Sequence, residues 1–351
     1  MLRAREPYTF KMKTGVLLAQ LGTPDSPSVK DVRKYLREFL TDKYVIDIPW
    51  LKRWLLVNLI IAPFRAPKSA KIYKEIWTDE GSPLLIHTQK SKELLQEKLG
   101  DSYHVAMGMR YQSPSIKNAL IELKDAGVSQ VIAIPLYPQY ASATSKSTIE
   151  NIKELSKLID GFPKINFIEK FYDNTLFKQS WEEIAKKHNP ENYDHVIFSF
   201  HGLPERQIKK LDQSKNHCLK VKNCCSMPCE WNEYCYKHHC YETAKNIAKN
   251  MNLSEEDYTV CFQSRLGKDP WIQPYSDHVI EEKGKEGCKN LLVFSPAFVA
   301  DCLETLYEIT IEYGELFVEH GGEKVQLVES LNSSPKWIDT LKGLVEEYET
   351  K

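Results

Sequence analysis

The stretch VIFSFHGLP, residues 196–204, predicts the fold more directly than any other part of the chain. Its first five residues carry no charge and form the near-continuous apolar run of a strand that is covered on both faces, as in a parallel sheet flanked by helices. The run ends at His201, and Gly202 and Pro204 then favour a turn. The same order of strand, loop and helical pattern recurs in GVLLAQLGTP (15–24), VIAIPLYPQYAS (131–142) and LLVFSPAFVAD (291–301). These stretches predict an α/β fold built on parallel strands.

Shorter apolar segments supply the remaining strands, at residues 103–109, 165–171, 258–262 and 325–329. Taken in order, the strands divide evenly between two halves, and AGVSQVIAIPL in the first half resembles EGCKNLLVFSP in the second. We therefore expect two similar Rossmann-like domains, each a four-stranded parallel sheet flanked by helices. The first covers residues 12–187 and the second residues 193–351, with the turn-forming segment KHNPENYD between them. A cysteine-rich insertion, residues 212–240, belongs to the second domain.

Length, charge and missing motifs exclude several classes of function. The 351 residues are enough for two buried cores, and a net charge of -1 offers no attraction to a nucleic-acid backbone. Neither of the glycine-rich motifs that cradle nucleotide phosphates occurs. The first 15 residues are charged and lack a following apolar run, so they do not form a secretory signal. We expect a cytoplasmic protein, in which clustered cysteines bind metal more often than they form disulfides.

The most apolar segment is IPWLKRWLLVNLIIAPF, residues 48–64. Its uncharged part is too short to span a bilayer. Two interpretations remain open, a buried helix or an apolar lip beside a pocket that contacts a membrane surface. Trp50 and Trp54 flank Lys52 and Arg53, an arrangement that favours the membrane interface because aromatic rings and extended cations suit the headgroup boundary.

A histidine and a row of acids are the candidates for catalysis. His201 stands at a strand end, where a neutral imidazole either binds a metal or accepts a proton, or else is structural. In ADCLETLYEITIEYGELF, Glu304, Glu308 and Glu312 recur every fourth residue and form one stripe of a helix. The stripe is either a solvated face or a path for protons and a hydrated divalent cation. Ligands of open α/β sheets lie beyond the carboxyl ends of the strands, so the site is expected between the domains.

Six of the nine cysteines lie in HCLKVKNCCSMPCEWNEYCYKHHC, residues 217–240. Their spacing matches neither the paired motifs of zinc ribbons nor the two common ferredoxin patterns. Four thiolates in a short loop still suit a metal site, and three histidines in the segment leave a mixed-ligand zinc site open. An iron–sulfur cluster and a zinc ion are thus both compatible with the sequence.

Five blocks carry a resemblance to a known family: VIFSFHGLPER, QSRLGKDPWIQPYSD, MRYQSPSI, PLYPQYASATS and ADCLETLYEI. The sequence resembles the ferrochelatases over nearly the whole chain, and these blocks occur along it in the same order as in the family. The resemblance implies the chelatase fold, two Rossmann-like domains around a porphyrin cleft. It also implies a lyase that inserts Fe(II) into a porphyrin, with protoporphyrin IX expected, and releases two protons on the way to haem. The alternatives are a chelatase for another metal and ring, such as cobalt, and a non-enzymatic iron or redox sensor.

The resemblance also implies roles for residues. His201 and Glu304 correspond to the family's catalytic residues, which bind the Fe(II) substrate or accept protons from opposite faces of the porphyrin. Glu308 and Glu312 correspond to further acids on that helix, which is locally π-helical in relatives. The expected substrate-binding residues are Leu21, Arg65, Arg110, Tyr111, Tyr137, Trp271, Glu308 and Glu312.

The cysteine segment resembles that of bacterial members that hold a [2Fe–2S] cluster within the second domain. The leading ligand set is Cys218, Cys225, Cys229 and Cys235, with Cys224 and Cys240 as the remaining thiols and zinc as the rival to the cluster. The expected partners are a porphyrin and ferrous iron, with peripheral contact to a membrane and no nucleic acid. The protein is expected to be a monomer or a homodimer.

Overall fold

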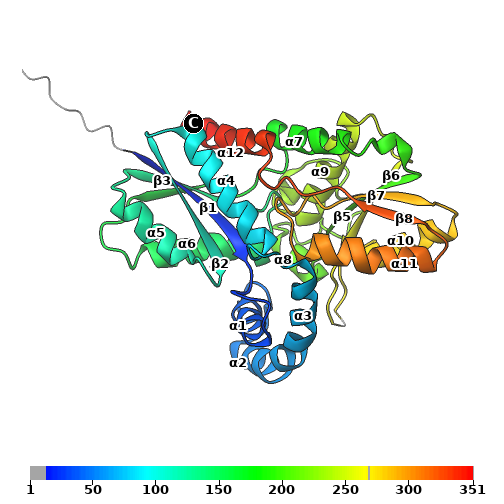
Figure 1. The fold of residues 1–351 in the computed structure, drawn as a ribbon, viewed down its shortest axis with the longest axis horizontal. Helices are drawn as coiled ribbons and strands as arrows, with labels where there is room; N and C mark the ends of the chain where they lie inside the picture. Colours follow the sequence, from blue (N-terminus) through cyan, green and yellow to red (C-terminus); the bar gives the residue numbers. More distant parts are fainter. Residues whose placement is uncertain (1–12, 268, 351) are drawn as a thin grey trace, which may run out of the picture.

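The computed structural model describes residues 13–267 and 269–350, and contains two parallel sheets of four strands each (Figure 1). The first is ordered β2-β1-β3-β4 and the second β6-β5-β7-β8, so the two halves share one topology. The strands are β1 (Thr14–Gly22), β2 (Tyr103–Tyr111), β3 (Gln130–Pro135), β4 (Lys164–Phe167), β5 (His195–His201), β6 (Tyr258–Gln263), β7 (Asn290–Phe294) and β8 (Lys324–Leu327). The predicted fold class is confirmed, and the two similar segments form β3 and β7, which hold the same place in each sheet.

Helices connect the strands and cover both faces of each sheet. Those of the first half are α1 (Val29–Leu40), α2 (Trp50–Leu55), the π-helical η1 (Leu56–Ile61), α3 (Ala62–Ile76), α4 (Pro83–Leu99), α5 (Ile116–Asp125), the π-helical η2 (Ser142–Lys146), α6 (Ser147–Ser156), α7 (Thr175–Lys186) and the 3₁₀ turn η3 (Pro190–Asn192). Those of the second half are α8 (Glu205–Leu211), the 3₁₀ turn η4 (Glu230–Asn232), α9 (Tyr236–Asn250), α10 (Ser276–Lys285), the π-helical η5 (Glu304–Glu312), α11 (Tyr313–Glu319) and α12 (Pro335–Glu349).

The central strands are mostly apolar because both of their faces are buried. In β5, Val196, Phe198 and Phe200 enter one core cluster, while Ile197 enters another on the opposite face. In β1, Val16 and Leu18 enter the same large cluster as the even-numbered residues of β5. The core between the two sheets is therefore continuous across both halves.

The edge strand β4 is shorter than the predicted strand 165–171. It ends at Phe167 because the chain then turns away from β3: the amide of Phe171 donates to the carbonyl of Pro138 (3.0 Å). The side chain of Phe171 packs edge-on against Phe177, with ring centroids 5.4 Å apart, in the shared core. Tertiary packing has thus replaced strand pairing at this end.

The last helix, α12, returns to the first half and packs on α4 and α7 (Figure 1). Thr340 of α12 and Ser180 of α7 share a buried hydrogen bond of 2.9 Å. We propose that the two sheets mark two domains that meet at residues 187–194, with α12 fastening the second to the first. The outer limits of the two predicted domains, residues 12 and 351, lie outside the described residues. The same holds for residues 1–12 of the N-terminal stretch, for which no secretory signal is expected.

A protrusion formed by α1, α2, η1 and α3 extends from the first half (Figure 1). Seven large apolar side chains of residues 48–64 are exposed: Trp50, Leu51, Trp54, Leu55, Leu59, Ile60 and Phe64. The interpretation of residues 48–64 as a buried helix is therefore wrong, since only Arg53, Val57 and Ala62 in α2, η1 and the start of α3 are buried. Arg53 is no interfacial cation either, because its Nη1 donates to the carbonyls of Ile46 (3.1 Å) and Ile48 (2.8 Å) inside the protrusion. Among the described residues, no helix has the length and apolar content needed to cross a bilayer.

Candidate active site and thiol site

His201 is held in one tautomer at the carboxyl end of β5. Its Nδ1 lies 2.6 Å from the carbonyl oxygen of Gly202, and because a carbonyl only accepts, Nδ1 carries the proton. In the neutral ring, Nε2 then has the lone pair that can take a proton or a metal. Trp271 packs over the following turn: a Cβ at Gly202 would lie 2.8 Å from the carbonyl of Gln263 and 3.2 Å from Cε3 of Trp271. Only glycine leaves room for this approach.

Gln263, at the end of β6, connects His201 to the acidic helix. It stands opposite His201 in the parallel register and is 1% exposed. Its Oε1 accepts from the hydroxyls of Ser199 (2.7 Å) and Ser295 (3.3 Å). Its Nε2 donates to the carbonyl of Glu304 (3.1 Å) and to Oε2 of Glu308 (3.0 Å). The amide is oriented by the two serines and thereby fixes the position of both acidic residues relative to the histidine strand.

The acidic residues lie on η5, a π-helix of nine residues, as the resemblance implied. Its hydrogen bonds close from i to i+5 rather than i+4, so the spacing of an ordinary α-helix does not describe it. Besides Gln263, Glu308 accepts from Ser264 and from the hydroxyl of Tyr313 (3.1 Å). The interpretation of the stripe as a solvated face is therefore wrong for Glu308, whose carboxylate is fixed by three donors.

Glu304 and Glu312 occupy different surroundings on the same helix. Glu304 is half-buried beside Cys302, and burial together with the charge of Glu304 raises the pKa of that thiol well above its usual range. The same charge, after burial, contributes to the raised pKa of Tyr73 on α3. Glu312 is exposed, and partial burial of its carboxyl and the charge of Glu308 raise its pKa. The row therefore runs from a half-buried acid facing α3 to an acid in contact with solvent.

A buried loop residue anchors the start of η5. Asp301, 7% exposed, accepts from the backbone amide of Ser330 (3.1 Å), from the amide side chain of Asn332 (2.7 Å) and from the hydroxyl of Thr305 (3.2 Å). These contacts join the start of the acidic helix to the loop that follows β8.

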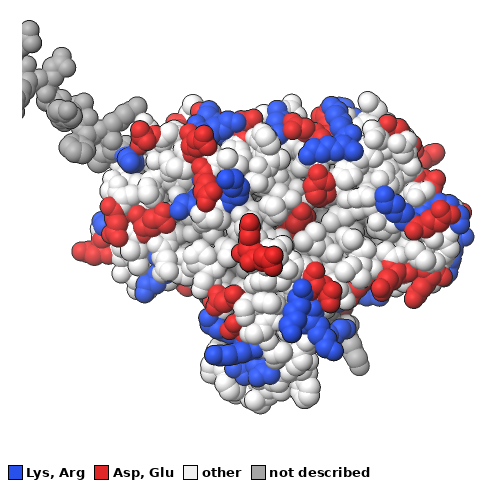
Figure 2. Space-filling model, in the orientation of Figure 1, with Lys and Arg blue, Asp and Glu red and all other residues white. Residues whose placement is uncertain are grey.

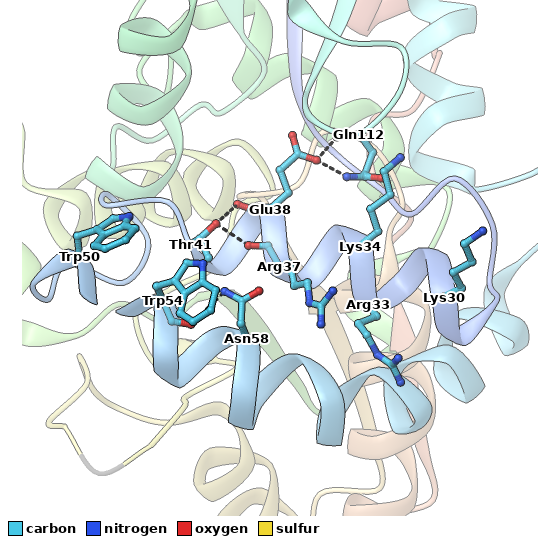
Figure 3. A pocket seen from close by; sticks show the side chains of 10 residues that line it. All are labelled: Lys30, Arg33, Lys34, Arg37, Glu38, Thr41, Trp50, Trp54, Asn58 and Gln112. Carbon is cyan, nitrogen blue, oxygen red and sulfur yellow. Dashed lines mark hydrogen bonds between the residues drawn. The ribbon is translucent and has the colours of Figure 1, made fainter. Parts of the chain in front are cut away.

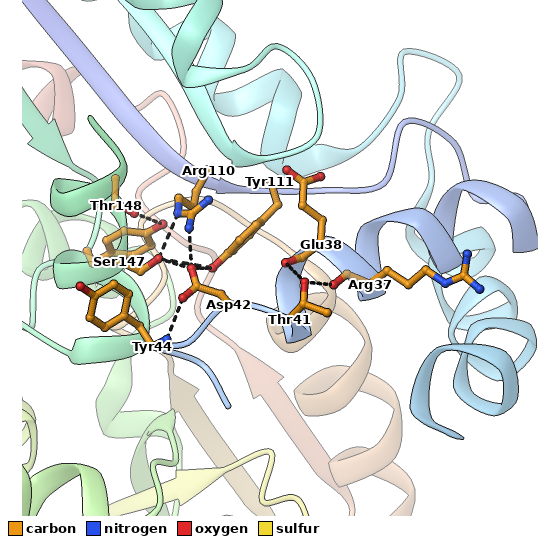
Figure 4. Close-up of polar contacts among 10 residues, drawn as sticks. Arg37, Glu38, Thr41, Asp42, Tyr44, Arg110, Tyr111, Ser147 and Thr148 are labelled. Atoms are coloured by element: carbon orange, nitrogen blue, oxygen red, sulfur yellow. Dashed lines mark hydrogen bonds and ion pairs between the residues drawn. The ribbon is translucent and has the colours of Figure 1, made fainter. Parts of the chain in front are cut away.

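Arg110 and Tyr111 converge on Asp42, a residue that no sequence motif indicated (Figure 4). Oδ2 of Asp42 accepts from Arg110 Nη2 (2.5 Å), the hydroxyl of Tyr111 (2.9 Å) and the hydroxyl of Ser147 (2.5 Å). The guanidinium also donates through Nε to Ser147 (3.0 Å). Arg110 lines a pocket of about 220 Å³, but its charge is already paired there, so an added carboxylate would have to compete with Asp42.

The other expected substrate-binding residues lie at the ends of the first sheet and on α3. Leu21, half-buried near the end of β1, packs against the apolar cluster of the protrusion. Tyr137 is buried, which raises its pKa, and its hydroxyl accepts from Thr148 (3.5 Å). Arg65 is exposed on α3, where its charge acts on Tyr73, the neighbour of Glu304.

Three thiols of the cysteine segment meet. Side-chain hydrogen bonding with Cys218 and Cys225 lowers the pKa of the Cys235 thiol. Cys224 Sγ lies 3.8 Å from Cys225 Sγ. The contacts of Cys229 differ, since its Sγ is 3.5 Å from Nε2 of His217. In the part of the chain that the structure describes, no three His, Cys, Asp or Glu residues are grouped closely enough to hold a single metal ion.

The thiol segment also contacts His201. Tyr236, which follows Cys235, donates its hydroxyl to the carbonyl of His201 (2.8 Å). His239 on the same helix accepts from the amide of Tyr140 (3.2 Å) and stacks on Tyr172 at 4.0 Å. The cysteine segment is therefore joined by α9 both to the histidine and to the first half of the chain.

Comparison with known proteins agrees with this geometry. A family model described as ferrochelatase matches residues 13–349. A ferrochelatase of Coxiella burnetii (strain Dugway 5J108-111) is 43% identical over 336 residues, which are 95% of this chain and 94% of the relative. One of Legionella pneumophila (strain Lens) is 45% identical over 338 residues, 96% of this chain and 99% of the relative.

Among solved structures, SirB from Bacillus subtilis with Fe3+ has a TM-score of 0.57, with 96% of this chain and 95% of that chain covered. At 10% sequence identity, this likeness concerns the fold alone. The match of the family model to residues 13–349, together with the identity to bacterial relatives along 95% of the sequence, shows that the chain belongs to the ferrochelatase family.

Proposed function

We propose that His201 and Glu304 act on opposite faces of the porphyrin in the reaction of this family, the insertion of iron into protoporphyrin for haem synthesis. Family membership along 95% of the sequence identifies the protein as a lyase with a porphyrin and ferrous iron as substrates. The observation that carries the residue assignment is the position of Gln263. It pairs in register with His201 and binds both Glu304 and Glu308.

The reaction requires that two pyrrole protons leave, that Fe(II) loses water and that the ring bends so that its lone pairs face the metal. His201 supplies a base for the first requirement, since Gly202 holds Nδ1–H and the lone pair of the neutral ring is then on Nε2. Carboxylate oxygens suit a hydrated divalent cation, and Glu304 lies at the inner end of the acidic row. Protons then pass outward through Glu308 to the exposed Glu312. Leu21, Tyr137 and Trp271 provide apolar and aromatic surface for the ring, and Arg65, Arg110 and Tyr111 lie near its propionates.

The two alternatives from the sequence have less support. A chelatase for cobalt and another ring, and a sensor without activity, both predict weak similarity to ferrochelatases, whereas the relatives here are 43% and 45% identical. Anaerobic incubation of the purified protein with Fe(II) and protoporphyrin tests the reaction: haem absorbance should appear with turnover. A protein that bound porphyrin and never released haem would overturn the proposal.

We infer that the cysteine segment holds a [2Fe–2S] cluster. Such a cluster takes four cysteine thiolates, and the segment gathers Cys218, Cys225 and Cys235 around one another. The 3.8 Å contact to Cys225 favours Cys224 as the fourth ligand over Cys229, which the sequence favoured and which contacts His217 instead. A bound cluster would supply a redox-sensitive link at the start of α9, and ligand assembly would accompany its binding.

The cluster is tested by metal and sulfide analysis of anaerobically purified protein. Iron and sulfide in equal amounts with visible absorbance support it, and stoichiometric zinc without sulfide would contradict it. Serine replacement of Cys224 and of Cys229, one at a time, identifies the fourth ligand by which variant loses the absorbance.

We further propose a cytoplasmic protein that contacts membranes through the apolar lip of residues 48–64. The support is the exposure of this surface, with Leu59 59% and Phe64 78% exposed. Leu59→Glu should lower binding to lipid vesicles without changing the thermal midpoint, because the side chain has little packing to lose. A large fall in thermal stability would instead assign Leu59 to a packed core.

A further inference from the structure

The protrusion carries a cationic groove that the reaction does not use. The groove has a volume of about 710 Å³ and lies between α1 and the helix of α2 and η1 (Figure 3). Its cations come from α1, and Trp50, Trp54 and Asn58 line the opposite side; the cations are Lys30, Arg33, Lys34 and Arg37. The net charge of the protein is only -1, so this positive charge is a local feature.

Two of the cations are available to bind an anion. Arg33 and Arg37 extend from α1 toward the helix of Trp54 and Asn58, whereas Lys30 and Lys34 point the other way (Figure 3). Lys34 is paired with Asp25 (2.9 Å). Within the described ranges, Arg33 Nε is buried without a hydrogen-bond partner, and neither Arg33 nor Arg37 forms a side-chain ion pair.

One acid also lines the groove, but it is directed elsewhere. Glu38 accepts from the backbone amide of Gln112 (3.1 Å) and from its side-chain amide. In Figure 3 its carboxylate points away from Arg33 and Arg37, toward Gln112. The charge of the groove itself is therefore set by the two arginines.

The groove adjoins the apolar lip of residues 48–64, which forms the tip of the protrusion. In Figure 2 this tip is white, free of charged side chains on the visible face, and blue side chains border it. Trp50 and Trp54, which are 67% and 42% exposed, belong to both the apolar surface and the groove. Exposed apolar side chains, tryptophans and adjoining cations suit the parts of a phospholipid surface, namely acyl chains, headgroup boundary and phosphates.

We propose that Arg33 and Arg37 bind the phosphates of an anionic phospholipid bilayer while the apolar tip enters its surface. The proposal rests on the membrane contact suggested above and adds the class of lipid. Arginine suits this role because its planar fork donates two parallel hydrogen bonds to a phosphate. A second copy of the chain fits the groove less well, since it would bring the same cations to the contact.

The test compares sedimentation of the full-length protein with vesicles of phosphatidylcholine and with vesicles that also contain phosphatidylglycerol. We expect tighter binding to the anionic vesicles, and a loss of this preference at high salt, where the screening length falls from ~10 Å at 0.1 M to ~3 Å at 1 M. The double variant Arg33→Gln/Arg37→Gln should bind anionic vesicles about 25-fold more weakly, about fivefold for each cation. Its binding to neutral vesicles should stay as in the wild type.

The control is Lys245→Gln/Lys249→Gln, which removes two exposed cations with the same spacing from α9. An equal loss in this control, or equal binding of the wild type to both vesicles, would overturn the proposal. So would self-association of the wild type that the arginine variant abolishes. If the double variant melts early, Arg37→Gln alone, at an exposed position, should still show the fivefold loss.

Iron insertion measured with detergent-dispersed porphyrin separates this inference from the proposed function. The arginine variant should keep wild-type turnover there, because neither residue contacts the catalytic groups. A wild type without turnover would count against the reaction assignment, and the vesicle comparison would still decide the lipid site.

Discussion

Replacing Gln263 by methionine should damage catalysis far more than folding. The change keeps the length of the side chain and removes four hydrogen bonds, two accepted from Ser199 and Ser295 and two donated to Glu304 and Glu308. Most of the partners keep another contact: Ser199 is 2.9 Å from the hydroxyl of Ser276, Ser295 donates to the carbonyl of Ser199 (3.0 Å), and Glu308 keeps Tyr313 (3.1 Å).

Because few groups become unsatisfied, we expect a stability loss of about 1–2 kcal/mol, equal to one or two net hydrogen bonds. The effect on turnover is larger, since a displacement of about 1 Å in a catalytic group lowers the rate by roughly 10²-fold. Thermal unfolding and anaerobic kcat for iron insertion measure the two effects separately.

A matched control is Gln207→Met, which removes another buried amide. Gln207 lies on α8, and its side chain donates to the carbonyl of Val45 (3.3 Å). It should lose similar stability and little kcat. If Gln263→Met kept wild-type kcat and porphyrin affinity, the amide would be a packing group, and the argument that it positions the acids would be refuted.

Three further results are expected. Glu304→Gln should abolish most iron insertion and Glu312→Gln should lose less, since only Glu304 lies at the inner end of the row. If both variants inserted iron at the wild-type rate in anaerobic assays, the acidic residues would form a solvated helix face. Glu312→Gln should also raise the thermal midpoint at neutral pH and leave it unchanged in acid. The raised pKa of this carboxyl means that the folded state holds the proton more tightly, so stability falls as pH rises through the titration range. Cys225→Ser should bleach visible absorbance, because its thiol is at the centre of the group, while Cys240→Ser should not; iron and sulfide analysis checks both.

Sequence reasoning captured the parts of the fold that depend on local pattern. The uncharged run of β5 and its turn predicted a doubly covered strand with His201 at its end, and both faces of β5 are buried. The apolar pattern of residues 48–64 fits a buried helix as well as an exposed lip, so the sequence alone does not distinguish the two. Only the tertiary position of α2 and η1 decided between them.

The details of the site depended on contacts distant in sequence. Arg110 and Asp42 are 68 residues apart, so their ion pair had no local signal. Gln263 was overlooked as a lone polar residue, yet its place at the end of β6, beside the strand of His201, was a usable sign. The thiol contacts were not predictable because residues 212–229 form turns without apolar periodicity.

The most direct test of the account is iron insertion by His201→Ala under anaerobic conditions, with porphyrin binding and thermal unfolding measured on the same sample. Its control is His195→Ala at the other end of β5, whose Nε2 contacts the hydroxyl of Thr259 (2.9 Å) far from the carboxyl ends of the strands. We predict that His201→Ala binds porphyrin, stays folded and forms no haem above background, while His195→Ala turns over normally. Turnover near the wild-type rate in His201→Ala would contradict the assignment of the histidine as the group that acts on the ring.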